Sequence, residues 1–199
     1  MNRVFDRRAT LAVCGFLLFI CWLSYHRAVY RPLGGNTNDK KDVRSKYVAL
    51  ASRFVGKQFP VATLRDAVFD SPRNTHFKES TVVILLGISG CNPCQTREIR
   101  NLEELYQRTN SRMKIIALLT NENKYEALLL RKVTSASFPF WYGEDSSLAK
   151  FNFIGKYPLV VLLRNQKVLW SFIPISTDDM FSTSALDSLY LILGKEKES

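Results

Sequence analysis

The pattern of hydrophobic and polar positions divides the chain from residue 43 onward into strands and helices. Runs of branched apolar residues are typical of strands buried on both faces, whereas apolar residues every three to four positions are typical of helices. By this rule we expect strands at residues 81–88, 113–119, 159–163 and 167–172. We expect helices at residues 43–54, 95–108, 122–133, 146–151 and 178–193.

The order of these elements predicts an α/β fold with a mixed sheet flanked by helices. The first strands should be parallel because helices connect them, and a tight turn at Asn165 and Gln166 predicts an antiparallel hairpin at the end. Asp178 or Asp179 can cap the closing helix, and Gly194 can end it. Residues 59–69 are expected to be extended chain with turns.

The N-terminal segment contains an apolar run at residues 9–25 that carries no charge and is flanked by arginines. Its length is close to the lower limit for a helix that spans a bilayer. A cleaved signal peptide is the alternative, but no small-residue cleavage pattern follows the run. We therefore predict an uncleaved single-pass anchor within residues 1–30, although the positive charges on its two sides do not by themselves fix its orientation.

Composition and charge complete the predicted organisation. Residues 31–53 form a linker, whose polar part at 32–42 predicts a tether, and a short helix; residues 54–194 form one domain, and 195–199 a charged tail. The net charge is +10, concentrated partly in the N-terminal segment beside the apolar run. This arrangement favours anionic lipid headgroups as partners, and since the chain shows no nucleic-acid motif we expect no nucleic-acid binding.

The chemistry of the predicted domain centres on Cys91 and Cys94, which lie between the first core strand and the following helix. Backbone N–H groups and the dipole at a helix N-terminus stabilise a thiolate there, so Cys91 is a candidate nucleophile and Cys94 a candidate resolving thiol. A metal site would need further ligands, and the domain offers only His76. A structural disulfide stays a second alternative, although it would close a very short loop.

The order of strand, Cys-x-Pro-Cys and helix resembles thioredoxin. The stretches "VGKQFPV" and "FPFWYGEDSSLAKFNFIGKYPLVVLLRNQKVLW" resemble the membrane-anchored TlpA/ResA-like branch of that superfamily, over most of the chain after residue 54. The resemblance implies a thioredoxin-like fold behind an N-terminal transmembrane helix. It implies that Pro158 follows a cis peptide bond, and that Tyr157, Pro158 and Gly90 contact a substrate peptide beside Cys91 and Cys94.

The sequence departs from the resemblance at two points. Ser89 and Gly90 stand where relatives often carry an aromatic residue, and the strand before the cysteines offers no buried acid to exchange a proton with the resolving thiol. Glu98 lies nearby in sequence, but we expect it at a solvated position of the helix.

The leading hypothesis is therefore a membrane-tethered thiol–disulfide oxidoreductase that uses Cys91 and Cys94 and no cofactor or metal. By resemblance, its domain lies outside the cytoplasm, receives electrons from a membrane donor and reduces client proteins, as in cytochrome maturation. Two alternatives remain open at the level of sequence. One is a peroxiredoxin-related peroxide reductase, and the other is a non-catalytic binding module or copper chaperone that uses both thiols and His76.

Overall fold

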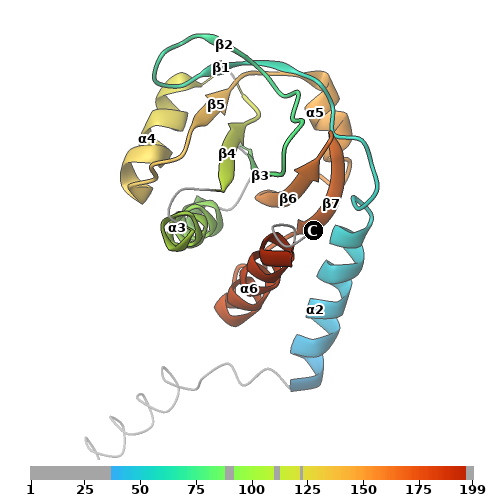
Figure 1. Cartoon of the computed structure of the whole chain (residues 1–199). Helices are drawn as coiled ribbons and strands as arrows, with labels where there is room; N and C mark the ends of the chain where they lie inside the picture. The colour runs from blue at the N-terminus through green and yellow to red at the C-terminus, as the bar shows by residue number, and fades with distance from the viewer. Residues whose placement is uncertain (1–36, 88–91, 110–112, 122, 196–199) are drawn as a thin grey trace, which may run out of the picture. The chain divides into compact units, whose positions relative to one another are not determined.

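A computed structural model describes residues 37–87, 92–109, 113–121 and 123–195 of the chain (Figure 1). Its strands are β1 (Thr63–Asp66), β2 (Pro72–Asn74), β3 (Thr81–Leu86), β4 (Lys114–Leu119), β5 (Phe140–Tyr142), β6 (Leu159–Arg164) and β7 (Lys167–Phe172). Its helices are α2 (Thr37–Ser52), α3 (Asn92–Arg108), α4 (Lys124–Thr134), α5 (Ser146–Phe151) and α6 (Asp179–Lys195). The described strands form one sheet in the order β2-β1-β5-β4-β3-β6-β7.

The four predicted strands are present as β3, β4, β6 and β7, and the five predicted helices as α2 to α6. Three further strands, β1, β2 and β5, were missed because each has only three or four residues. The predicted tether at 32–42 is wrong in part, because α2 already begins at Thr37. α6 continues to Lys195, past the glycine expected to end it.

Strand β3 forms the centre of the sheet. It pairs in parallel with β4 and antiparallel with β6, and all six of its residues are buried. Val82, Ile84 and Leu86 face a core that is covered by α3, α4 and α6. Val83 and Leu85 face a second core, which α5 and the C-terminal end of α2 cover. The prediction of a mixed sheet with helices on both faces is therefore confirmed, and Figure 1 shows α3 and α6 next to each other.

The hairpin between β6 and β7 turns at Asn165 and Gln166, which both have positive φ angles of 48° and 64°. This conformation matches the right-handed twist of the strands it joins. Gln166 is buried, accepts a hydrogen bond from the Phe77 backbone N–H at 2.6 Å and donates one to the Thr75 carbonyl at 2.6 Å. The turn therefore holds the segment before β3 at the end of the sheet where β6 ends.

Strand β7 lies at one edge of the sheet, but neighbouring segments cover it. Gln58 forms a β-bridge with Lys167, and the Val168 backbone exchanges hydrogen bonds with Gly56 and Lys57 at 2.8 and 2.9 Å. The opposite edge is β2, which has three exposed residues and begins with a proline.

The chain divides into two units, Met1–Lys41 and Asp42–Ser199. In the part of the chain that the structure describes, no helix combines the length and the apolar character needed to cross a bilayer. The predicted anchor at residues 9–25 lies outside the described residues, so it stays a prediction.

The loop between β1 and β2 is held to the sheet by Asp70. Its carboxylate accepts hydrogen bonds from Tyr142 Oη at 2.5 Å and from Arg65 Nε at 2.7 Å, and Lys124 Nζ lies 3.4 Å away. These contacts, that of Tyr142 first and that of Arg65 next, hold the pKa of Asp70 well below its usual value. Asp70 therefore favours the folded state while it is ionised.

Replacing Asp70 by asparagine is expected to lower the stability at pH 7 and to flatten its decrease in acid. Because the folded pKa is depressed, the contribution is present above the unfolded pKa of about 4 and is lost as the pH falls below it. Urea unfolding of both proteins at pH 7 and pH 3 tests this, with Asp187→Asn on the exposed face of α6 as the control. If the free energy of unfolding changes equally between pH 7 and pH 3 in wild type and in Asp70→Asn, the prediction is contradicted.

Candidate functional site

Cys94 lies in the first turn of α3, close to the carboxyl end of β3. The cysteine is 6% exposed and is disulfide-bonded. Its partner lies outside the described residues, as do two of the predicted site residues, Cys91 and Gly90. The helix α3 begins at Asn92, three residues before its predicted start at residue 95. Cys94 therefore belongs to the helix itself.

Gln95 fixes this first turn to the sheet. Its side chain is 1% exposed and makes two hydrogen bonds to the residue that follows β3. Gly87 N–H donates to Gln95 Oε1 at 3.0 Å, and Gln95 Nε2 donates to the Gly87 carbonyl at 3.0 Å. Sequence reasoning missed this contact, since a single glutamine after a cysteine carries no recognisable signal. The contact between Gln95 and Gly87 determines where Cys94 lies relative to the end of β3.

Tyr157 and Pro158 lie at the same end of the sheet, where β6 begins. The peptide bond between them is cis, in agreement with the prediction. The Tyr157 ring lies against Gly87, where a Cβ atom would be only 2.6 Å from Tyr157 Cδ2. Thr120, after β4, donates a hydrogen bond to the Leu86 carbonyl at 3.0 Å and lies 3.4 Å from the Tyr157 hydroxyl. The fold thus brings Tyr157 and Gln95, the residue after Cys94, together at Gly87.

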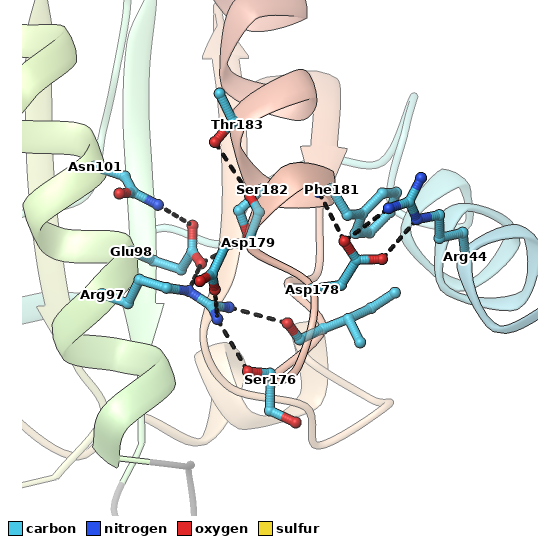
Figure 2. A network of polar contacts seen from close by, with 11 residues as sticks. Arg44, Arg97, Glu98, Asn101, Ser176, Asp178, Asp179, Phe181, Ser182 and Thr183 are labelled. Carbon is cyan, nitrogen blue, oxygen red and sulfur yellow. Dashed lines mark hydrogen bonds and ion pairs between the residues drawn. The ribbon is translucent and has the colours of Figure 1, made fainter. Parts of the chain in front are cut away.

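Glu98 is fully buried, so the prediction of a solvated position is wrong. Arg97 Nε and Ser182 Oγ each donate to Glu98 Oε1 at 2.8 Å, and Asn101 Nδ2 lies 3.3 Å from Glu98 Oε2 (Figure 2). The carboxylate is therefore directed at the contact between α3 and α6, where three donors replace water. It lies one helical turn after Cys94, on the same side of α3.

The structure contradicts a copper site that combines the cysteines with His76. His76 precedes β3, between residues that Gln166 holds at the far end of the sheet, whereas Cys94 follows β3. The six residues of β3 separate the two ends by about 20 Å.

Comparison with solved structures identifies the architecture. The chain is similar to a putative protein disulfide isomerase from Bacteroides thetaiotaomicron, with a TM-score of 0.54, 14% identity and coverage of 68% of this chain and 87% of the other. It is similar to the thioredoxin domain of a thiol-disulfide oxidoreductase from Bacteroides vulgatus, with a TM-score of 0.52, 14% identity and coverage of 65% and 94%. The fold is thioredoxin-like.

The thioredoxin-like fold is shared with proteins that carry different names. The peroxidoxin BcpB from Mycobacterium tuberculosis has a TM-score of 0.54 at 16% identity, with coverage of 69% of this chain and 97% of the other. No family model matches the sequence. No curated protein matches it either. At these identities the likeness establishes the fold and does not establish the reaction.

Proposed function

We propose that the chain is a membrane-tethered thiol–disulfide oxidoreductase that exchanges disulfides with partner proteins through Cys91 and Cys94. The observation that carries the proposal is the disulfide-bonded, buried Cys94 in the first turn of α3, at the end of the sheet where the segment Tyr157–Pro158 also lies. A thiol at this place is close to the unpaired N–H groups of the helix terminus, which favour a thiolate.

The exchange conserves electrons without a cofactor. The Cys91 thiolate attacks one sulfur of a client disulfide, the client S–S bond breaks, and a mixed disulfide with Cys91 forms. The Cys94 thiolate then attacks the Cys91 sulfur and breaks the mixed disulfide. The client leaves with two thiols after it takes up two protons, and the protein keeps the oxidised pair. A dithiol donor must then supply two electrons to reduce that pair again.

The membrane setting is part of the proposal. Residues 9–25 supply an apolar segment of near-spanning length, and the basic residues beside it suit anionic headgroups. In this setting the domain lies outside the cytoplasm, its electrons come from a membrane donor, and its clients are extracytoplasmic proteins with paired cysteines, such as those of cytochrome maturation. The resemblance to the TlpA/ResA-like branch supports each of these assignments.

The test is thiol trapping with the full-length chain in detergent or native membranes. In Cys94→Ser the mixed disulfide cannot be resolved, so we expect covalent client adducts that dithiothreitol releases, and none in Cys91→Ser. The wild-type pair should titrate as one two-electron couple across a glutathione redox series. A pair that stays oxidised throughout, or that consumes peroxide faster than it reduces a protein disulfide, would overturn the proposal, the second result in favour of the peroxiredoxin alternative.

A further inference from the structure

The turn that follows β7 is held by an arginine of α3, the helix that carries Cys94. Arg97, three residues after Cys94, donates from Nη2 to the Ile175 carbonyl and from Nη1 to the Ser176 carbonyl, both at 3.0 Å (Figure 2). Its Nη1 also contacts Asp179 Oδ1 at 2.5 Å, and its Nε donates to Glu98. One guanidinium thus joins two main-chain carbonyls and two carboxylates.

This turn follows β7 at the end of the sheet where β6 begins, the end that carries the segment Tyr157–Pro158. The last residue of β7 pairs with Val160, and β6 and β7 are antiparallel, so the chain after β7 continues toward the start of β6. The next residues do not leave the protein, since Ile173 and Ile175 are 3% and 7% exposed. Ser176 is the first exposed residue of the turn. In the sheet β7 lies on the side of β6 away from β3, so the turn follows the strand that is farther from Gly87.

A second arginine holds the same turn from another helix. Arg44 of α2 donates from Nε and Nη2 to the two carboxylate oxygens of Asp178, at 2.6 and 2.7 Å. Asp178 in turn caps α6 by accepting from the Phe181 N–H at 3.1 Å. In this network Arg44 contacts side chains, the Asp178 carboxylate and the Phe181 ring, whereas Arg97 binds the main chain and comes from the helix that carries Cys94 (Figure 2).

We propose that Arg97 is a positioning residue for protein clients. It holds the turn Ile175–Ser176 at a fixed distance from α3. In this arrangement the turn and the segment Tyr157–Pro158 bind an extended client segment from two sides, next to Cys94. The substrate class is a polypeptide with a disulfide in an extended stretch, rather than a small disulfide. The planar fork of arginine suits this task because it can bind two carbonyls in one fixed geometry. The inference rests on the proposed function.

The experiment compares two disulfide substrates in the full-length protein: insulin as a polypeptide and oxidised glutathione as a small disulfide. In Arg97→Gln we expect the rate constant for insulin to fall about tenfold, and that for glutathione to fall less than about threefold, because misplacing the turn affects only a substrate that contacts it. Arg97→Lys, which keeps the charge but not the fork, should restore only part of the insulin rate.

Arg44→Gln is the matched control, since it breaks a similar ion pair on the same turn. It should keep the ratio of insulin rate to glutathione rate within about twofold of wild type. Circular dichroism and urea unfolding confirm that each variant is folded under assay conditions. If Arg97→Gln is not, Arg97→Lys takes its place and should shift the ratio in the same direction.

Two results overturn the inference while leaving the proposed function intact: both substrates slow down equally in Arg97→Gln, or Arg44→Gln changes the ratio as much as Arg97→Gln does. A wild-type protein that exchanges disulfides with neither substrate refutes the proposed function itself.

Discussion

Replacing Gly87 by alanine is expected to destabilise the protein by about 2 kcal/mol and to reduce exchange with protein clients. The new Cβ atom would lie 2.6 Å from Tyr157 Cδ2 and 2.8 Å from Cγ and Cε2, which is closer than carbon atoms can approach. The backbone cannot easily move away, because both of its polar groups are bound by the buried Gln95. Overpacking of this kind typically costs about 1–3 kcal/mol.

Urea unfolding of Gly87→Ala measures the cost, and Gly155→Ala is the matched control. Gly155 belongs to the same end of the sheet and has a positive φ angle of 64°, but a Cβ there would meet nothing within 4 Å. Its replacement should cost about 1 kcal/mol from backbone strain alone. The further change Tyr157→Ala should recover stability only in Gly87→Ala; equal recovery in both backgrounds, or in neither, would contradict the clash.

Replacing Glu98 by alanine is expected to destabilise the protein by about 3 kcal/mol. The carboxylate is fully buried and accepts from Arg97, Ser182 and Asn101, so the change leaves a buried hydroxyl unpaired and a small cavity between α3 and α6. Breaking a buried ion pair costs about 3–5 kcal/mol, and the lower end applies because the Arg97 side chain is 21% exposed and keeps other acceptors.

Asp179→Ala is the control, because it removes the other carboxylate from the same arginine. The Asp179 side chain is 81% exposed, so water replaces much of what the contact provides, and we expect a loss below about 1 kcal/mol. Chemical denaturation of both variants at pH 7 compares them directly. If the two variants lose similar free energy of unfolding, burial does not make the contact of Glu98 more stabilising than that of Asp179.

The central part of the fold could be predicted because its signals are local. β3 is a continuous apolar run that is buried on both faces, and α3 carries Ile99, Leu102 and Leu105 at helical spacing. Strands β1, β2 and β5 gave no such signal, since each has only three or four residues, and β1 and β5 pair across a long stretch of sequence. Arg65, for example, pairs with Tyr142, and nothing near either residue in the sequence indicates the other.

The candidate site, too, could be predicted only where its signals are local. The place of Cys94 between strand and helix and the position of Tyr157 before Pro158 were visible as motifs. Glu98 was not, because its burial depends on Ser182, which lies 84 positions further along the chain. A helix position next to an apolar stripe is solvated unless another element covers it, and only the tertiary structure shows that α6 does so.

The covered edges of the sheet limit how this protein can associate with other chains. Free strand edges invite an incoming strand, and so promote β-sheet growth and aggregation. Here residues 56–58 cover the start of β7, and further along Ser171 Oγ donates to the Ala51 carbonyl of α2 at 2.6 Å. At the other edge, β2 is short and contains Pro72, which cannot donate to a new strand. An extended polypeptide therefore finds few free backbone groups to pair with at either edge of the described sheet.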